Sequence, residues 1–294
     1  MVKKKYFNIR KKCPLCHSKK IKIIFSKTFE EIRSKEFFFK HLNNKFPLIM
    51  LEDSFYKLSE CLNCKIIFQN HVLNKKYNFK FYNDYINHEK VNLEKNAPKL
   101  KTGAYKNEIE LFEKIFKNKN IKILEFGAGL GAWIIALKQK NFNNIYGVEI
   151  SKKRRQFLKK NKINCYENLN YIKNKKFDLI YSDQTLEHLV DPGKILKTLV
   201  SKLKKDGILV VKIPSGLFLK KKLKNNYYAQ KDEAIPLEHI NIFTKKSLNF
   251  IKSYFNLQRV DLHKYFKIYE YNFYKYLISD YYQRFFCKKI IFKK

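Results

Sequence analysis

Arginine is scarce in this sequence, although basic residues are abundant. Only 6 of its 63 basic residues are arginine, and the formal net charge at pH 7 is +37. Such a charge ordinarily indicates a phosphate-rich partner, either nucleic acid or an anionic membrane. Arginine is the usual reader of bases and phosphates, however, and the lysines are spread along the whole chain among many Asn, Ile, Phe and Tyr residues. This composition is typical of an AT-rich genome, which favours a compositional origin of the charge over a phosphate-binding surface.

Long apolar runs are absent as well. The basic segment 1–12 reaches Cys13 without an apolar stretch, so neither a signal peptide nor a transmembrane helix is readable. We therefore expect a cytoplasmic protein. Its 294 residues, 45% of them hydrophobic, suffice for one full-sized α/β domain and a smaller appendage.

Cysteine is infrequent, but four of the six cysteines form two C-x-x-C pairs, C-P-L-C and C-L-N-C. In a reducing compartment such pairs hold metal more often than they form disulfides. Redox use is the alternative, but no thioredoxin-like βαβ pattern surrounds either pair. We predict that residues 1–75 form a small zinc-ribbon-like module with a closed, structural zinc site, and that His17 and His71 lie outside the ligand set. The predicted ligands are Cys13, Cys16, Cys61 and Cys64.

The rest of the chain divides by composition and by hydrophobic periodicity. Residues 76–104 are polar and predict a connector, whereas residues 263–294 form a basic, aromatic tail that either lies on an anionic membrane or packs on the domain. Between them, near-continuous apolar strands alternate with amphipathic helices, which indicates an α/β fold with a doubly wound, mostly parallel sheet. We expect strands over 121–126, 145–150, 164–166, 177–181, 208–213 and 257–261, and helices over 105–116, 132–140, 152–160, 193–203 and 245–254.

Glycine is missing from the first hundred residues and concentrated at one later turn. All eight glycines lie at or after Gly103, and three of them fall within 127–131, between a predicted strand and a predicted helix. Glycine lets the backbone approach a ligand closely at such a turn, and Glu149, about 20 residues downstream, stands where a carboxylate accepts hydrogen bonds from an adenosine ribose. These letters also satisfy a dinucleotide-binding pattern, so the turn alone is compatible with a nicotinamide enzyme or with a methyltransferase.

Further motifs separate these two enzyme classes. The run E-x-G-x-G-x-G begins at Glu125, F-D-L-I and L-E-H-L-V-D-P follow within 177–192, and L-K-K-D-G covers 203–207. Together they resemble the class I S-adenosylmethionine-dependent methyltransferases over residues 105–262. Two cysteine pairs ahead of such a domain are similar to the zinc-binding region of many bacterial enzymes, including sugar C-methyltransferases.

The resemblance implies a seven-stranded sheet and S-adenosylmethionine as the cofactor. It also implies that the glycine turn and Glu125 hold the methionine part of the cofactor, that Glu149 holds the ribose, and that Asp183 lies where the chain passes the cofactor. The cofactor-binding residues that it predicts are Glu125, Phe126, Gly127, Ala128, Gly129, Gly131, Glu149, Ile150 and Asp183.

Three residues are the candidates for catalysis. Methyl transfer from a sulfonium is an in-line displacement, so the enzyme aligns the reactants and deprotonates the nucleophile where necessary. His188 is the candidate base because imidazole titrates near neutral pH, and Glu187 beside it is expected to orient the ring or bind substrate. His239 begins H-x-x-x-F-T-x-x-S-L, a segment of the same family, and is expected to line the acceptor pocket. Capping and packing are the alternative roles, since Thr244 also fits a helix start.

A divalent metal at the Glu187-His188 pair is not expected. The segment is similar to the E-x-x-E-H run of ubiquinone-biosynthesis O-methyltransferases, in which both acids and the histidine serve a metal. Gln184 replaces the first acid here. We therefore predict a methyltransferase that acts on a small molecule or a carbohydrate. The alternatives are an RNA methyltransferase and a non-catalytic, zinc-containing RNA-binding or scaffold protein.

Overall fold

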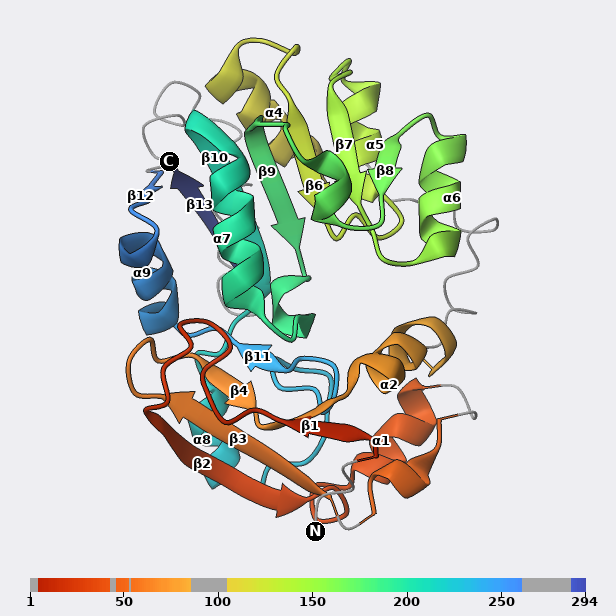
Figure 1. Ribbon diagram of the computed structural model, residues 1–294, viewed down its shortest axis with the longest axis vertical. Helices are drawn as coiled ribbons and strands as arrows, with labels where there is room; N and C mark the ends of the chain where they lie inside the picture. The colour runs from red at the N-terminus through yellow and green to blue at the C-terminus, as the bar shows by residue number, and fades with distance from the viewer. Residues whose placement is uncertain (1–4, 43–45, 53, 86–104, 261–286) are drawn as a thin grey trace. The chain divides into compact units, whose positions relative to one another are not determined.

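The computed structural model describes residues 5–42, 46–52, 54–85, 105–260 and 287–294 (Figure 1). The chain divides into two compact units, each assembled from three segments. The first, here called the cysteine unit, comprises Met1–Val91, Leu186–Ile195 and Pro214–Ile251. The second, here called the sheet unit, comprises Asn92–Thr185, Leu196–Ile213 and Lys252–Lys294. The predicted boundaries of 1–75, 76–104, 105–262 and 263–294 stay a prediction.

Two small antiparallel sheets make up the strands of the cysteine unit. In one of them β1 (Phe7–Ile9) pairs with β5 (His71–Leu73). The other has the order β11-β4-β3-β2, and its strands are β2 (Ile21–Thr28), β3 (Phe55–Cys61), β4 (Ile67–Gln69) and β11 (Asn241–Ile242). An apolar strand therefore follows each cysteine pair along the chain, β2 after the first pair and β4 after the second.

Aromatic side chains from distant segments fill the core of the cysteine unit. Phe29, Phe38 and Tyr56 from the N-terminal segment are buried with Tyr227, whose ring stacks on Tyr56 at a centroid distance of 5.9 Å. The N-terminal segment alone therefore does not complete this core. The helices and short helical turns of the unit are α1 (Ser34–His41), η1 (Leu48–Met50), α2 (Lys75–Lys80), η2 (Phe81–Tyr85), η7 (Leu186–His188) and α8 (Leu219–Lys224).

A seven-stranded, mostly parallel sheet organises the sheet unit. Its order is β12-β13-β10-β9-β6-β7-β8, in which β10, β9, β6, β7 and β8 run parallel to their neighbours and β12 pairs antiparallel with β13. The strands are β6 (Ile123–Phe126), β7 (Ile145–Val148), β8 (Asn164–Tyr166), β9 (Phe177–Asp183), β10 (Leu203–Pro214), β12 (Gln258–Arg259) and β13 (Cys287–Lys293). Strand order reverses between β6 and β9, which makes the sheet doubly wound, as the sequence predicts.

The helices of this fold follow the predicted βαβ rhythm (Figure 1). They are α4 (Lys106–Phe116), α5 (Ala132–Gln139), α6 (Lys152–Lys160), η6 (Leu169–Ile172) and α7 (Pro192–Lys202), whose first turn belongs to the cysteine unit. The last helix of the predicted rhythm, α9 (Lys245–Tyr254), belongs mostly to the cysteine unit. The central strands are buried on both faces, and all four residues of β6 are buried. Trp133 of α5 stacks on Tyr181 of β9 at 3.9 Å between ring centroids. Burial on both faces explains why these strands read as continuous apolar runs.

The end of the chain contributes a strand to the sheet. The residues of the predicted tail from 263 to 286 lie outside the described residues, but β13 lies between β10 and β12. Its side chains Ile290, Ile291 and Phe292 are buried. These three residues therefore pack in the domain, which was one of the two expectations for the tail, and are not available to a membrane surface.

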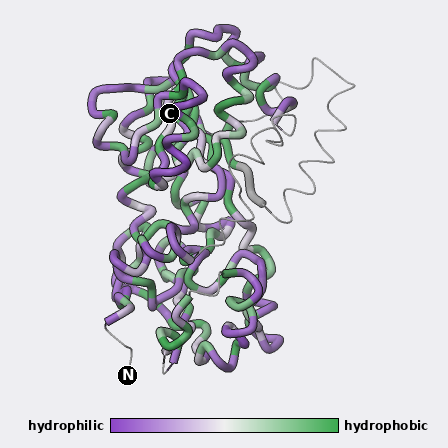
Figure 2. The backbone as a smooth tube through the Cα atoms, turned by 90° about the vertical axis from the view of Figure 1, so that its right-hand side faces the viewer, coloured by the Kyte–Doolittle hydropathy of each residue, from purple (hydrophilic) through white to green (hydrophobic). Residues whose placement is uncertain are grey.

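Hydrophilic residues are distributed over both units rather than gathered in one place (Figure 2). This distribution agrees with a compositional origin of the lysine excess. Among the residues that the structure describes, no helix is long and apolar enough to cross a membrane.

Candidate functional site

Four cysteine thiols meet where the two C-x-x-C turns of the cysteine unit face each other. Cys13 Sγ lies 3.4 Å from Cys64 Sγ, and Cys16 Sγ lies 3.6 Å from Cys61 Sγ. A tetrahedral zinc ion with bonds of about 2.3 Å holds its sulfur ligands about 3.8 Å apart. The four thiols therefore need little movement to bind such an ion. This is the complete predicted ligand set, and its donor chemistry fits zinc.

Backbone amides support the thiolates at this cluster. The N–H groups of Leu15 and Cys16 donate to Cys13 Sγ at 3.4 Å, and the neighbouring Cys64 thiol lowers the pKa of Cys13 to about 5. His17 Nε2 lies 3.2 Å from Asp191 Oδ1 instead, and His71 Nδ1 donates to the carbonyl of Phe55 at 2.9 Å. Neither histidine belongs to the thiol cluster, as the sequence predicts.

Three glycines with positive φ form the turn between β6 and α5 of the sheet unit: Gly127 at 80°, Gly129 at 56° and Gly131 at 75°. A Cβ atom at Gly127 would lie 2.1 Å from Thr185 Oγ1, so a side chain there would displace Thr185. A Cβ atom at Gly129 would meet no atom within 4 Å. The backbone at Gly129 therefore borders open space, which is the condition for a ligand to approach it closely.

Glu149 follows β7 and reaches back to this turn. Its Oε2 accepts a hydrogen bond from Gly129 N–H at 2.8 Å, and its Oε1 accepts one from Ser151 N–H at 2.8 Å. Arg155 Nη1 donates to the carbonyls of Glu149 and Ile150 at 2.7 and 2.6 Å, while the Ile150 side chain is exposed. The predicted 20-residue spacing thus corresponds to a direct contact between the acid and the glycine turn.

Glu125 lies in β6, two residues before the turn, and is buried. Burial, together with the charges of Asp183 and Glu149, raises the pKa of Glu125 well above its ordinary value. A hydrogen bond from the backbone of Ile134 favours the carboxylate, but Oε2 accepts no hydrogen bond among the described residues. The side chain therefore has an acceptor atom to offer. Phe126 and Ala128, which flank Gly127, are also buried.

Sequence reasoning missed a polar network around Asp183 at the end of β9. Lys212 Nζ of β10 lies 2.8 Å from Asp183 Oδ2 and donates to Tyr181 Oη at 3.1 Å. Tyr181 Oη in turn donates to Glu108 Oε2 of α4 at 3.2 Å. Both carboxylates raise the pKa of Lys212 despite its burial. One signal in the sequence could have indicated this network, namely the single lysine within the apolar run 208–213.

Glu187, His188 and His239 come together in the cysteine unit. One ligand atom of each lies within 4.8 Å of the others, so this arrangement is able to hold a cation as well as to act in acid–base chemistry. His188 Nε2 lies 3.9 Å from Glu187 Oε1, and the Glu187 side chain is only 1% exposed. Asn241 of β11 holds the preceding turn, because its Nδ2 donates to the carbonyl of Leu186 at 3.1 Å.

Backbone carbonyls fix the tautomer of both imidazoles. His188 Nδ1 bonds the carbonyl of Glu238 at 2.9 Å, and His239 Nδ1 bonds the carbonyl of Asp232 at 2.6 Å. A carbonyl oxygen only accepts, so each Nδ1 carries a proton. Nε2 of each neutral ring then holds the lone pair. Burial lowers the pKa of His239 to about 4, which keeps that ring neutral at physiological pH.

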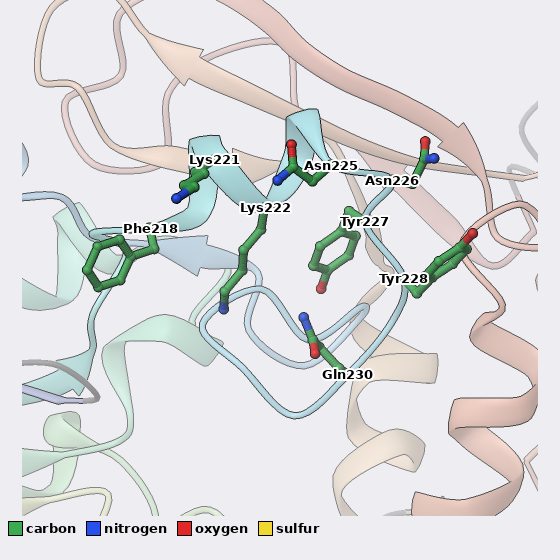
Figure 3. Close-up of a pocket in the computed structure, with 8 residues that line it drawn as sticks. All are labelled: Phe218, Lys221, Lys222, Asn225, Asn226, Tyr227, Tyr228 and Gln230. Carbon is green, nitrogen blue, oxygen red and sulfur yellow. The ribbon is translucent and has the colours of Figure 1, made fainter.

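An open cavity of about 530 Å³ lies in the cysteine unit along α8 and the segment that follows it (Figure 3). Phe218 and Tyr228 stand at opposite ends of this cavity, with Lys222 and Tyr227 between them. The cavity lies within the Lys-rich stretch 217–236 of the sequence.

Comparisons with known proteins were made for the sequence and for the fold. A family model described as a methyltransferase domain matches residues 99–261, which is more than half of the chain. The plantazolicin methyltransferase BpumL in complex with SAH is similar in fold, with 14% identity and a TM-score of 0.50 over 74% of this chain and 93% of that chain. A comparison with curated proteins gives no match.

Two further solved structures resemble the chain more distantly. One is a SAM-dependent methyltransferase from Archaeoglobus fulgidus, with 16% identity and a TM-score of 0.41 over 75% of this chain and 100% of that chain. The other is the magnesium protoporphyrin IX methyltransferase from Synechocystis PCC 6803, with 12% identity and a TM-score of 0.45 over 69% of this chain and 87% of that chain.

Proposed function

Since the chain belongs to the class I S-adenosylmethionine-dependent methyltransferases, we propose that it transfers the methyl group of S-adenosylmethionine to a small-molecule or carbohydrate acceptor. The observation that carries the cofactor side of this proposal is the open backbone at Gly129, held by Glu149. Family membership favours a methyltransferase over the nicotinamide enzyme that the glycine pattern alone allowed.

The cofactor supplies an electrophilic methyl group on a sulfonium, and the residues of the glycine turn fit such a ligand. Glu125 would accept a hydrogen bond from the ammonium of the methionine part, because its buried Oε2 has an acceptor position to offer. Glu149 would hold the ribose, and Gly127, Gly129 and Gly131 would pass their backbone close to the ligand. Phe126, Ala128, Ile150 and Asp183 complete the proposed cofactor-binding set.

On the acceptor side, His188 is the proposed general base. Its Nδ1–H is committed to a backbone carbonyl, so Nε2 has the lone pair that takes the proton of the acceptor nucleophile. The buried carboxylate of Glu187, 3.9 Å away, stabilises the imidazolium that forms. His239, neutral and adjacent, is proposed to line the acceptor site. The four cysteines are proposed to hold a structural zinc ion.

Calorimetric titration with S-adenosylmethionine and, separately, with NADH tests the proposed function. We expect micromolar binding of the methyl donor and no binding of NADH. In Gly129→Val a branched side chain enters the open space beside the turn, so we expect the affinity for S-adenosylmethionine to fall by about 100-fold or more, equivalent to about 2.7 kcal/mol or more.

The matched control is Asn141→Val. Asn141 also has a positive φ, of 65°, and lies in the same unit on an exposed loop after α5. This variant therefore carries similar backbone strain without entering the turn. Equal cofactor affinity in Gly129→Val and Asn141→Val would contradict the site assignment, and NADH binding by the unmodified chain would contradict the proposed function.

A further inference from the structure

The first cysteine pair packs directly against residues 186–193, here called the histidine segment because it carries Glu187 and His188. Pro14 and Leu15 lie between the two cysteines of this pair, and Gly193 N–H donates to the carbonyl of Pro14 at 3.1 Å. A Cβ atom at Gly193 would lie 2.1 Å from the carbonyl oxygen of Leu15. Only a glycine therefore permits this approach of one backbone to the other. Both segments belong to the cysteine unit.

Arg10, three residues before this pair, also holds the histidine segment. The residue is buried, at 9% exposed. Its Nη1 donates to Asn241 Oδ1 at 2.8 Å and to the carbonyl of Ile240 at 3.2 Å, and its Nη2 donates to the carbonyl of Leu189 at 3.3 Å. The planar guanidinium thus joins β11 to the histidine segment in one fixed geometry, which an ammonium group does not reproduce.

The contact with Arg10 fixes the orientation of the Asn241 amide as well. A guanidinium only donates hydrogen bonds, so the amide oxygen faces it. The amide nitrogen then faces the histidine segment. Its acceptors, at 3.1, 3.3 and 2.7 Å, are the carbonyls of Leu186, Glu187 and Leu189. Arg10 therefore positions the backbone on both sides of His188, through Asn241 and by its own bond.

The charge of Arg10 suits a loaded cysteine cluster. Burial lowers the pKa of Arg10 to about 9, whereas the charges of Asp191 and Cys13 act in the opposite direction and favour the cation. The acceptors of its three hydrogen bonds are neutral groups. Four thiolates around one divalent ion keep a net negative charge, which stabilises a buried cation nearby. A loaded cluster therefore stabilises the guanidinium that holds the histidine segment.

We infer that Arg10 and the first cysteine pair are positioning elements for His188, an inference that rests on the proposed function. Once its cysteines hold zinc, the turn that contains Pro14 is fixed, and its contact with Gly193 and the bonds of Arg10 hold the histidine segment against it. The ring of His188 thereby keeps its Nδ1–H on the carbonyl of Glu238. The cysteine cluster thus orients the proposed base without contacting substrate or cofactor.

The test reads the tautomer of His188 by nitrogen NMR of the full, zinc-loaded chain with isotope-labelled histidine. The nitrogen shifts distinguish Nδ1–H from Nε2–H, and a His188→Gln variant assigns the signals. We expect the Nδ1–H form in the unmodified chain. In Gly193→Ala the added methyl group separates the cysteine turn from the histidine segment, so the tautomer ratio should move by about 5-fold or more toward Nε2–H, as the bond to Glu238 weakens. Arg10→Lys keeps the charge but loses the planar fork, and should move the ratio in the same direction.

Two controls separate positioning from a general loss of structure. His239 belongs to the same unit, and its Nδ1–H bond to the carbonyl of Asp232 does not involve the histidine segment, so its tautomer should not change. Gly207→Ala is the matched control, because a Cβ atom there would also meet backbone oxygens, at 3.0 Å, but in the sheet unit. We expect every variant to retain the zinc content of the unmodified chain.

Three results would overturn the inference. The first is a His188 tautomer in Gly193→Ala and Arg10→Lys that matches the unmodified chain, and the second is an equal change at His188 and His239 in these variants. The third is an unchanged His188 tautomer after a chelator has removed zinc from the unmodified chain. Titration of the same preparations with S-adenosylmethionine tests the proposed function separately. The expected tautomer changes in a chain that binds no S-adenosylmethionine would contradict the proposed function and leave the positioning of His188 intact.

Discussion

The carboxylate of Glu125 is buried beside two other acids, Asp183 and Glu149, and its pKa is raised. A raised pKa means that the folded protein holds this proton more tightly than the unfolded chain does. As the pH rises above the ordinary glutamate pKa, the unfolded chain ionises more readily than the folded protein does, so the free energy of unfolding falls. Below that pKa both states are protonated, and the cost is absent.

Glu125→Gln removes this cost while keeping an acceptor for the backbone of Ile134. We expect the free energy of unfolding at pH 7 to rise by about 1 to 2 kcal/mol, and the gain to vanish near pH 4. We also expect the affinity for S-adenosylmethionine to fall by about 10-fold, because a charge-assisted hydrogen bond is replaced by a neutral one. Urea denaturation at several pH values and calorimetry measure the two effects.

Glu110→Gln, on α4, is the control for this substitution, since Glu110 is only partly buried. A Glu125→Gln protein that lost stability at pH 7 and bound the cofactor normally would refute both parts of the expectation. Stabilisation together with weaker binding would identify Glu125 as a residue kept for the ligand at a cost to the fold.

At the scale of elements, β13 shows how much the end of the chain contributes to the sheet. Ile291 is 3% exposed and packs in the main core of the sheet unit, and its carbonyl accepts the N–H of Val260 at 3.0 Å. We expect Ile291→Ala to lower the free energy of unfolding by about 2 to 5 kcal/mol. Trp133 is the chain's single tryptophan and lies in this core, so its fluorescence in urea reports the change.

Lys293→Ala, on the same strand, is the matched control. Lys293 is exposed and pairs with Asp206 at 2.9 Å, and an ion pair at the surface contributes little to stability because water screens it. If the two variants unfolded at the same urea concentration, β13 would not be an integral strand of the sheet in solution.

Local pattern predicted most elements but not their long-range partners. The helix over 152–160 and the strand over 164–166 are observed with the predicted bounds. The seven-stranded, mostly parallel sheet is confirmed as well. By contrast, β13 follows a long basic, aromatic stretch, and no local signal shows that residues near 290 pair next to β10.

The candidate site likewise has parts that the sequence predicts and parts that it does not. The association of Gly129 with Glu149 can be predicted from their spacing, because both residues lie within one βαβ unit. The pairing of Lys212 with Asp183, and the approach of His239 to His188, depend on strand register and on contacts over many residues. Sequence reasoning singled out His188 and His239 separately, but only the structure places their rings 5.0 Å apart.

At the scale of the whole molecule, the four-cysteine cluster belongs to a unit that includes two later segments of the chain. We expect Cys61→Ser, which removes one of the four proposed zinc ligands, to loosen that unit at β4 and β11, which pair through Phe68 and Asn241. Hydrogen–deuterium exchange should be faster by about 10-fold or more in residues 67–69 and 241–242, and Trp133 fluorescence should report little change.

Leu62→Ser is the control, since Leu62 lies between the second pair of cysteines, is 46% exposed and contributes no thiol. We expect the zinc content, measured on both variants, to fall only in Cys61→Ser. Identical exchange in the two variants would show that the cluster does not stabilise its unit.

The interleaving of the two units also governs the order in which a ribosome makes them available. Residues 1–91 emerge first, yet their core includes Tyr227 and other residues of Pro214–Ile251. At about 5 to 20 residues per second, the early segment waits about 8 to 30 seconds for these partners. All four cysteines are present once Cys64 has emerged, so a metal bound there would hold the nascent segment together during that wait. Zinc supply during synthesis would then decide how much of the chain matures rather than aggregates.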